Sequence, residues 1–401
     1  MASRGQFAAG AAVERVPGPA GPSRRSAVEP FIAMDVMAAA ARLEAEGRDI
    51  VHMEVGQPGA PAPRAVLEAA RAALAGGRLG YTEALGMSGL RQRIARHYGE
   101  AYGADVPAAR VMVTTGSSGG FNLIFLGAFD PGARIAMATP AYPAYRNILA
   151  ALGLEAVEIA VGPDTRWALT PAHIEAAHRE RPLAGVLIAS PANPTGTIVA
   201  PEALEALAGT CAALGIRLIS DEIYHGLVYQ GRAETALRFS DDAIVVNSFS
   251  KYYCMTGWRI GWLVLPPDLV RPFERLSQSL YVSVSELSQR AAIAAFDGAG
   301  ELEAVRRSYA RNRALLLERL PALGFDEIAP ADGAFYIYAS VARFTDDSAG
   351  FASRMLNEAG LAATPGGDFD RERGHLYIRF SIAGTEERVR EGVERLATWL
   401  R

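Results

Sequence analysis

Several short apolar segments of this 401-residue chain lead directly into polar side chains of types that do chemistry. The segments predicted as strands, with the residues that follow them, are Val111 to Thr115 with Gly116, Ser117 and Ser118; Gly185 to Ala189 with Asn193; Arg217 to Ser220 with Asp221 and Tyr224; and Ala243 to Asn247 with Ser248 and Lys251. Ligands of an open parallel sheet bind in the crevice at the carboxyl ends of its strands. We therefore expect an amide, an acid with a phenol, and an amine to meet in one crevice.

Taken one at a time, these features are ambiguous. The turn at Gly116 needs glycine and serine for geometric reasons alone, and it matches neither the P-loop nor the dinucleotide-binding pattern. An acid such as Asp221 at the end of a strand often caps the next helix, and a lysine such as Lys251 usually points into solvent. A shared site is favoured because three successive strands each end in such a group: an amide, an acid with a phenol, and an amine.

The combination of groups indicates one cofactor. A lysine amine that is removed from water loses its proton and forms a Schiff base with an aldehyde. An acid opposite a pyridine nitrogen keeps that ring protonated and electron-withdrawing, and amide and phenol donors suit an oxygen on the same ring. Arg259, eight residues after Lys251, adds a planar cation for a phosphate. These residues together predict pyridoxal 5'-phosphate.

The order of the motifs resembles the class I and II aminotransferases of the aspartate aminotransferase superfamily, fold type I of the pyridoxal-phosphate enzymes. The most specific segment is Ser248-Phe249-Ser250-Lys251 with Gly257-Trp258-Arg259-Ile260-Gly261, which is similar to the lysine signature of that family. Supporting segments are Val55-Gly56-Gln57-Pro58, Tyr81-Thr82-Glu83-Ala84-Leu85-Gly86, Pro140-Ala141-Tyr142-Pro143, Asn193-Pro194-Thr195-Gly196, Asp221-Glu222-Ile223-Tyr224 and Arg379-Phe380-Ser381. The resemblance covers most of the chain.

The resemblance implies a role for each matching residue. Lys251 holds the internal aldimine and moves a proton, Asp221 pairs with the pyridine nitrogen, and Tyr224 holds the ring oxygen, which makes these three the catalytic candidates. The other implied cofactor contacts are Asn193 to the ring oxygen, Tyr142 on the ring face, Gly116, Ser117, Ser118, Ser248 and Arg259 to the phosphate, and Tyr81 to the phosphate of the neighbouring subunit. The implied substrate contacts are Arg379, Gly56 and Asn193 to the α-carboxylate.

The same resemblance implies a homodimer with shared active sites and transfer of an amino group from an L-amino acid to a 2-oxo acid. One alternative is a carbon–sulfur β-lyase on the same fold, which uses the same aldimine and expels a β-substituent. A second alternative is a non-catalytic regulator that binds the cofactor. Residues 1 to 30 are too short, and too unlike a helix-turn-helix, for the DNA-binding domain of such relatives.

The amino donor is predicted to be neutral or aromatic. Dicarboxylate-specific members of the family bring a second arginine from the neighbouring subunit, and the corresponding stretch from Tyr281 to Glu286 has none. Some bacterial members place a lysine in the phosphate loop, where this chain has Ser117. An apolar pocket is expected instead, with 2-oxoglutarate or pyruvate as acceptor. Its candidate lining is Phe31, Tyr252, Tyr253, Tyr281 and Phe335.

Apolar runs alternate with helical patterns from Arg64 onward, which predicts an α/β fold with a mainly parallel sheet covered by helices. Further strands are expected at Arg134 to Ala138 and Ile260 to Val264, and helices at Leu90 to Tyr98, Phe121 to Phe129 and Pro201 to Leu214. Long helical stretches after Leu265 predict a smaller α+β domain. Its expected elements are helices Ile32 to Glu46 and Glu301 to Arg319, and strands Ile50 to Glu54, Phe335 to Ala339 and Leu376 to Ser381.

The resemblance adds a seven-stranded sheet to this expectation. The predicted division is a flexible tail over residues 1–26, a large cofactor-binding domain over residues 60–300, and a small domain from residues 27–59 and 301–401. The tail is rich in Ala, Gly, Pro, Arg and Ser, and it lacks the hydrophobic stretch of a secretory signal.

Composition narrows the class of protein. The 40 basic and 44 acidic residues give a net charge of −4, and half of all residues are hydrophobic, which excludes a disordered chain and argues against nucleic-acid binding. No apolar run reaches the roughly 18 to 20 residues that span a bilayer. Two cysteines, Cys211 and Cys254, make neither a disulfide framework nor a zinc site, so a cytoplasmic protein is expected. The six histidines show no ligand spacing, which predicts no metal.

Overall fold

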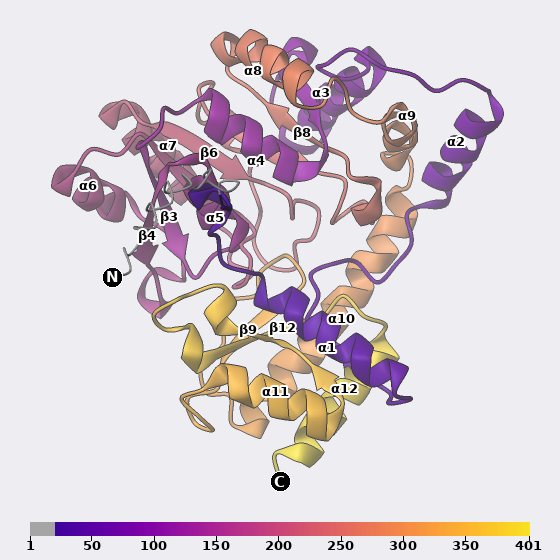
Figure 1. The fold of residues 1–401 in the computed structure, drawn as a ribbon, viewed down its shortest axis with the longest axis vertical. Coiled ribbons are helices and arrows are strands. Elements are labelled where there is room, and N and C mark those ends of the chain that lie inside the picture. The colour runs from indigo at the N-terminus through magenta and orange to yellow at the C-terminus, as the bar shows by residue number, and fades with distance from the viewer. Residues whose placement is uncertain (1–20) are drawn as a thin grey trace, which may run out of the picture.

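Seven strands form one twisted sheet in the upper part of the molecule (Figure 1), in a computed structural model that describes residues 21–401. In spatial order they are β2 (Val111–Thr114), β8 (Gly261–Val264), β7 (Ile244–Ser248), β6 (Arg217–Asp221), β5 (Gly185–Ala189), β3 (Arg134–Thr139) and β4 (Glu155–Ala160). Only β8 runs antiparallel to its neighbours. The carboxyl ends of the other strands therefore share one edge.

Alternate residues of each central strand enter two different hydrophobic cores, because successive side chains of a strand point to opposite faces. Val186 and Ile188 of β5 belong to one core, and Leu187 between them belongs to the other. Both faces are thus buried, which explains the continuous Val, Ile and Leu runs of these strands. Helices on the first face are α3 (Ser88–Tyr102), α6 (Pro171–Glu180), α7 (Pro201–Leu214) and α9 (Glu286–Ala295), and those on the second are α4 (Gly116–Gly127), α5 (Ala144–Leu152) and α8 (Pro267–Leu280).

Local signals place the helix ends. Helix α7 begins at Pro201. Proline lacks a backbone N–H, but the first N–H of a helix has no partner within the helix, so no hydrogen bond is lost there. The helix ends before Gly215, whose φ of 65° is left-handed. The long helix α10 (Ala299–Leu323) ends in the same way before Gly324, with φ 102°. Helix α2 (Arg64–Ala75) packs against α9 at the right of the molecule (Figure 1).

A third core lies in the lower part of the molecule (Figure 1) and has its own small sheets. These are β11 (Thr364–Pro365), β12 (Tyr377–Ser381) and β9 (Tyr336–Ser340) in one sheet, and β1 (Val51–His52) with β10 (Leu361–Ala362) in the other. Helices α1 (Ile32–Ala45), α11 (Ser348–Ala359), α12 (Glu386–Trp399) and the end of α10 surround them. The pairing of β1 with β10 brings an N-terminal segment beside the C-terminal part of the chain.

The fold class expected from the sequence is confirmed. All predicted strands are present, with each end within two residues of the expected position, whereas β4 and the two-residue strands β10 and β11 were not predicted. Strand β4 lies at the sheet edge and carries Glu155 and Glu158, so its residues lack the continuous apolar run of the central strands. Helix α4 begins at Gly116, five residues before the predicted start at Phe121, because Gly and Ser give no helical signal. The division into domains stays a prediction, and residues 1–20 of the predicted tail lie outside the described part.

Within residues 21–401, no helix is both long and apolar enough to cross a membrane. The same residues contain no group of three or more His, Cys, Asp or Glu side chains placed to hold a metal ion.

Candidate active site

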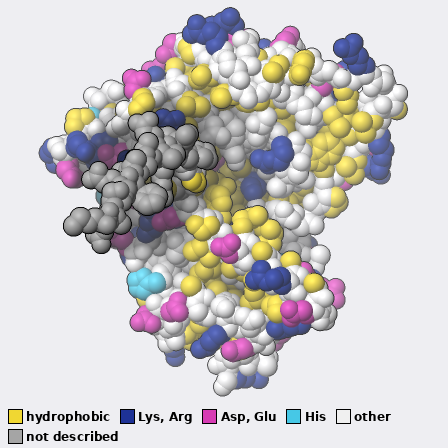
Figure 2. Space-filling view, in the orientation of Figure 1, with side chains coloured by type: hydrophobic (Ala, Val, Ile, Leu, Met, Phe, Trp, Pro, Cys, Tyr) yellow, Lys and Arg dark blue, Asp and Glu magenta, His cyan; other side chains and the backbone are white. Residues whose placement is uncertain are grey.

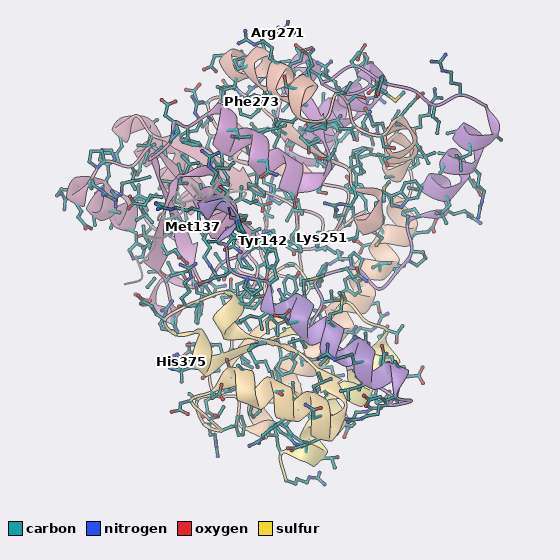
Figure 3. All side chains as sticks on the ribbon, in the orientation of Figure 1. Met137, Tyr142, Lys251, Arg271, Phe273 and His375 are labelled. Carbon is teal, nitrogen blue, oxygen red and sulfur yellow. The ribbon has the colours of Figure 1, made fainter. Side chains whose placement is uncertain are left out.

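A cavity of about 310 Å³ opens at the carboxyl edge of the seven-stranded sheet, between the upper and lower parts of the molecule. Figure 3 shows Lys251 and Tyr142 near this boundary, just above α1. Side chains from both parts line it: Phe31, Ala33, Met34, Val55, Gly56, Gln57, Ser117, Ser118, Phe121, Tyr142, Pro143, Tyr145, Asn193, Asp221, Ile223, Tyr224, Ser250, Lys251, Thr256, Arg259, Tyr336, Asp368, Phe369 and Arg379. Ten of the predicted site residues therefore reach one space.

Lys251 follows the end of β7 by three residues and is half-buried in the cavity wall. Its Nζ donates a hydrogen bond of 2.6 Å to the carbonyl oxygen of Gly56. Burial lowers the pKa of Lys251 to about 8, and the nearby cations Arg379 and Arg259 act in the same direction. The amine therefore gives up its proton more easily than a surface lysine.

Asp221 is the last residue of β6, and its carboxylate is buried. Its Oδ1 accepts from the backbone N–H of Ile223 at 3.1 Å, and its Oδ2 accepts from the hydroxyl of Tyr145. Burial raises the pKa of Asp221 to about 6, while these two hydrogen bonds and the charge of Lys251 lower it. The carboxylate is thus fixed in orientation and lies within the electrostatic reach of the amine.

Two phenols meet beside these groups. The hydroxyls of Tyr224 and Tyr336 lie 2.8 Å apart, and burial raises the pKa of Tyr224 well above its usual value. Both phenols therefore stay protonated at neutral pH and can donate hydrogen bonds. Asn193, from the turn after β5, is also buried here, and its Oδ1 accepts from Arg379.

The turn between β2 and α4 forms a cradle with Arg259. Gly116 has a φ of 74°, and a Cβ there would lie 2.6 Å from a guanidinium nitrogen of Arg259. A Cβ at Gly261 would lie 3.0 Å from the backbone carbonyl carbon of Gly116 and 3.1 Å from the backbone nitrogen of Ser117, so this position also needs a residue without a side chain. The first N–H groups of α4 and the hydroxyls of Ser117 and Ser118 gather next to this cation, which is the arrangement that binds anions at helix N-termini.

Ser248 differs from the other residues predicted for this cradle. Its hydroxyl is buried and donates to the carbonyl of Ile260 at 2.9 Å, and it also hydrogen-bonds to the hydroxyl of Ser250 at 3.0 Å. Ser250 lines the cavity, and Ser248 does not. A direct role for Ser248 in binding stays a prediction, and Ser250 is the better-placed hydroxyl.

Arg379 on β12 closes the other side of the cavity. Its guanidinium donates to the Asn193 Oδ1 at 2.9 Å and to the carbonyl oxygen of Glu54 at 2.6 Å. The rings of Tyr336 and Phe369 lie 4.3 and 4.6 Å from its Cζ. The Nε is buried without a hydrogen-bond partner. A buried guanidinium with a free N–H is suited to bind a carboxylate.

Two further predicted contacts lie in different places. Gly56 lines the cavity directly, and a Cβ at this position would collide with the hydroxyl of Tyr336. Tyr81 is 85% exposed and lies outside the cavity. Its position leaves Tyr81 free to contact another molecule.

Of the five residues expected to form an apolar lining, only Phe31 lines the cavity of the described chain. Phe31 lines the cavity and stacks on Tyr142, with ring centroids 6.0 Å apart. Tyr252, Tyr253, Tyr281 and Phe335 do not line it. Tyr253, for example, packs against Phe249 and Phe296 in the core, and Phe335 is fully buried among other aromatic rings. Closeness in sequence to a site residue therefore does not place an aromatic ring in the site, because burial of the ring in a hydrophobic core stabilises the fold.

Several lining residues were not expected from the sequence. They are Tyr145, Tyr336, Phe369, Asp368 and Ser250. Tyr145 had a weak local signal, because it lies only three residues after Tyr142; the two rings are in edge-to-face contact, with centroids 5.4 Å apart. Tyr336, Asp368 and Phe369 come from the lower part of the molecule and lie outside the one motif recognised on its strands, Arg379-Phe380-Ser381.

Glu222 and His225, which flank the acid and the phenol, lie outside the cavity. Glu222 accepts from Ser220, Thr235 and the backbone of Ala236, and burial raises its pKa to about 8. His225 hydrogen-bonds through Nδ1 to the hydroxyl of Tyr102 at 2.8 Å, and burial lowers its pKa to about 3. This buried network agrees with a structural role for His225.

Comparison with known proteins places the chain in a family. Residues 48–396 match the family described as aminotransferase class I and II. The chain is 50% identical over 380 residues to a valine–pyruvate aminotransferase of Mycobacterium tuberculosis, covering 94% of this chain and 97% of the relative. It is 33% identical over 383 residues to an aspartate/prephenate aminotransferase of Thermus thermophilus, covering 94% and 98%.

Solved structures agree with this result. A crystal structure of an aminotransferase from Mycobacterium tuberculosis superposes with a TM-score of 0.93 at 49% identity, covering 95% of this chain and 99% of that one. An aspartate aminotransferase from Thermus thermophilus gives 0.89 at 32% identity, covering 94% and 99%. The chain therefore belongs to the class I and II aminotransferases, and it transfers an amino group from an amino acid to a 2-oxo acid.

Proposed function

We propose that this aminotransferase uses pyridoxal 5'-phosphate bound to Lys251, accepts neutral or aromatic L-amino acids, and acts as a cytoplasmic homodimer. The observation that carries the proposal is the convergence of three groups on one cavity: the amine of Lys251, the carboxylate of Asp221 and the guanidinium of Arg379. An amine, an acid and a carboxylate-binding cation are the groups that such chemistry needs.

The residues present fit this cofactor. The cradle at Gly116, with the hydroxyls of Ser117 and Ser118 and the guanidinium of Arg259, suits a phosphate dianion. Asp221 would pair with the pyridine nitrogen. Asn193 and Tyr224 would hold the ring oxygen, and Tyr142 would cover one face of the ring.

When bound, pyridoxal phosphate withdraws electrons from the substrate Cα, and this chain's residues direct the chemistry. Lys251 would take a proton from that carbon, because its lowered pKa of about 8 leaves a useful fraction of free amine near neutral pH. The Nζ of Lys251 donates to the carbonyl oxygen of Gly56, and both residues line the cavity, so the amine lies beside the proposed substrate site. Asp221 stays oriented by Tyr145 and Ile223, so it would present one fixed carboxylate to the ring nitrogen.

Arg379 would orient the substrate by binding its α-carboxylate. Asn193 and Glu54 already fix the guanidinium plane through hydrogen bonds, so little freedom is lost on binding. With the carboxylate held at Arg379 and the amino group near Lys251, the side chain of the amino acid would extend toward the remaining wall, which contains Phe31 and Met34. That apolar wall supports a neutral donor, as does the valine named for the relative at 50% identity.

A homodimer is supported by the surface around Tyr81. Large hydrophobic side chains are exposed at Leu74, Leu280 and Val282 as well as at Tyr81. Figure 2 shows such side chains gathered over α2 at the right of the molecule. In the proposed dimer these residues are covered, and Tyr81 reaches the phosphate of the neighbouring active site.

The proposal is tested with purified protein and a panel of amino donors against pyruvate and 2-oxoglutarate. We expect acceptor-dependent transfer from neutral or aromatic donors, and a borohydride-trapped cofactor on Lys251 identified by mass spectrometry. Lys251→Ala should lower kcat by roughly 10² to 10⁴ or more, since this residue moves the proton. Release of ammonia and pyruvate from cystathionine without any acceptor, or trapping at another lysine, would contradict the proposal.

A further inference from the structure

The first turn of α1 forms one wall of the cavity. Phe31, Ala33 and Met34 line it, and Figure 2 shows hydrophobic side chains gathered along α1 below the central hollow. The Phe31 ring lies nearly parallel to that of Tyr142, at an interplanar angle of 17°. This wall is apolar and lies opposite the polar groups at the sheet edge.

A single remote carboxylate holds this turn in place. Both oxygens of Asp368 accept backbone hydrogen bonds at the start of α1, from Ile32 at 3.0 Å and from Ala33 at 3.3 Å. The residue at the N-cap position, Phe31, offers no side-chain hydrogen bond of its own. Asp368 is 2% exposed and lies in the short 3₁₀ turn Gly366–Asp368. Because N-cap hydrogen bonds stabilise a helix start, Asp368 fixes the position of the wall.

The chain before α1 is anchored to the same region. The carboxylate of Glu29 lies 3.0 Å from Arg371 and 3.7 Å from Arg146. Arg146 is buried and also donates to the backbone oxygen of Asp368 at 2.8 Å. These contacts leave the wall with few alternative positions.

Asp368 also contributes charge to the cavity. The charged side chains of this chain that line it are Lys251, Arg259, Arg379, Asp221 and Asp368. Under the proposed function each of the three cations already has a partner, namely the cofactor aldehyde, its phosphate and the substrate α-carboxylate. A second carboxylate on the substrate would find no free cation in the described lining and would be repelled by Asp368.

We propose that Asp368 determines the substrate class: it holds Phe31 and Met34 over the cavity to receive an apolar side chain, and its charge disfavours substrates with a second carboxylate. Asp368 is thus a positioning and specificity-determining residue. The inference rests on the proposed function, since it assigns the α-carboxylate to Arg379. It predicts that monocarboxylic 2-oxo acids such as pyruvate are better acceptors than dicarboxylic ones such as 2-oxoglutarate.

The charge is tested by Asp368→Asn, which keeps the shape and one acceptor oxygen. We expect kcat/KM for glutamate and 2-oxoglutarate to rise about tenfold relative to valine and pyruvate, mainly through a lower KM for the dicarboxylates. One of the two backbone hydrogen bonds is lost, because the amide nitrogen of Asn cannot accept from an N–H, so the KM for valine should rise, but by less than in Asp368→Ala. An unchanged ratio would overturn the role of the charge.

The position of the wall is tested by Asp368→Ala, which removes both hydrogen bonds. The KM for valine and phenylalanine should rise about fivefold, whereas the KM for alanine, whose side chain is too short to reach α1, should change little. Asp347→Ala is the matched control, since Asp347 caps α11 through Gly350 and does not line the cavity. Equal losses for all donors, or the same selectivity change in the control, would overturn the inference.

Binding without turnover gives an independent measurement. Calorimetry with the cofactor-loaded protein and two unreactive carboxylates, 3-methylbutanoate and glutarate, should show glutarate binding about tenfold more tightly to Asp368→Asn than to wild type. The affinity for 3-methylbutanoate should not increase, because this ligand carries no second carboxylate and the variant keeps only one of the two hydrogen bonds to the start of α1. If wild type transfers no amino group from any donor, the proposed function fails. If it does so and Asp368→Asn has wild-type selectivity and binding, only this inference fails.

Discussion

The amine of Lys251 and the carboxylate of Asp221 are brought toward similar proton affinities by burial. The pKa of the lysine falls to about 8, and that of the aspartic acid rises to about 6. Proton transfer is most efficient when the pKa of the acting group lies near the working pH. Removal from water thus prepares a lysine for proton transfer near neutral pH.

Arg379 offers the clearest test of substrate binding at this scale. Arg379→Lys keeps the charge but loses the planar fork that binds a carboxylate through two parallel hydrogen bonds. We expect the KM for the amino donor to rise roughly 10- to 100-fold, with a smaller change in kcat. Steady-state kinetics with valine measure the effect. A KM equal to that of wild type would show that the α-carboxylate is held elsewhere.

His52 should make stability depend on pH. Its ring bridges Glu54 and Glu44 at 2.8 and 3.0 Å, and the hydrogen bond to Glu54 raises the pKa of His52 from 6.5 to about 9. A raised pKa in the folded state contributes stability that is fully present below pH 6.5 and is lost as the pH rises through about 9. Compared with His52→Gln, wild type should therefore have the larger free energy of unfolding only in the acidic part of this window.

Denaturant unfolding of both proteins across the window measures this difference. His375→Gln is the matched control, because His375 is exposed and lies in the 3₁₀ turn Gly374–Leu376 on the lower part of the molecule (Figure 3), away from β1 in sequence. The same pH dependence in the control, or a difference between wild type and His52→Gln that grows with pH, would contradict the assignment.

At the scale of elements, the start of α4 decides whether an anion can be held. Helix α4 begins at the end of β2, so its free N–H groups point toward the cavity edge. Only a residue without a Cβ fits at Gly116, where Arg259 approaches closely and φ is positive. The strand, the turn and the cation thus form the cradle together.

Gly116→Ala tests the cradle. The new methyl group would displace Arg259 and strain a backbone with φ 74°, so the dissociation constant for pyridoxal phosphate should rise about 10- to 100-fold. Absorbance titration measures it. Gly103→Ala is the control, because its φ of 66° carries the same strain with nothing within 4 Å. Equal affinities in the two variants would contradict the assignment of the phosphate to this cradle.

For the molecule as a whole, the cavity forms only where the upper and the lower part meet, and residues far apart in the sequence line it. Lys251 and Asp221 come from the seven-stranded sheet, whereas Arg379 comes from the three-stranded sheet below it (Figure 1). Neither sheet alone could bind both ends of an amino acid. Ligands commonly bind at such junctions.

Shared sites in the proposed dimer predict complementation. Lys251→Ala and Tyr81→Ala should each lower activity. The Tyr81 side chain is exposed, so its replacement should leave the fold intact. In a mixed dimer one site carries both changes and the other carries none, so refolding the two variants together should restore about a quarter of wild-type activity. Activity and oligomeric state after co-refolding measure this. No recovery despite mixed dimers would contradict the contribution of Tyr81 to the neighbouring site.

The sequence by itself determined the central strands and the order of the chemical groups at their ends. Parallel strands put their carboxyl ends on one edge, so Asn193, Asp221 and Lys251 are brought together by local patterns alone. The apolar runs of these strands are continuous because both faces are buried. This is why their type and position were predictable.

Only the tertiary structure decided which aromatic rings face the cavity and what holds its outer wall. Phe335 and Tyr336 are neighbours in sequence, yet the first is core and the second lines the site. Asp368 caps a helix that begins 336 residues earlier. Such contacts follow from the packing of one part against the other, since periodicity in a sequence fixes the face of an element but not the partner that this face meets.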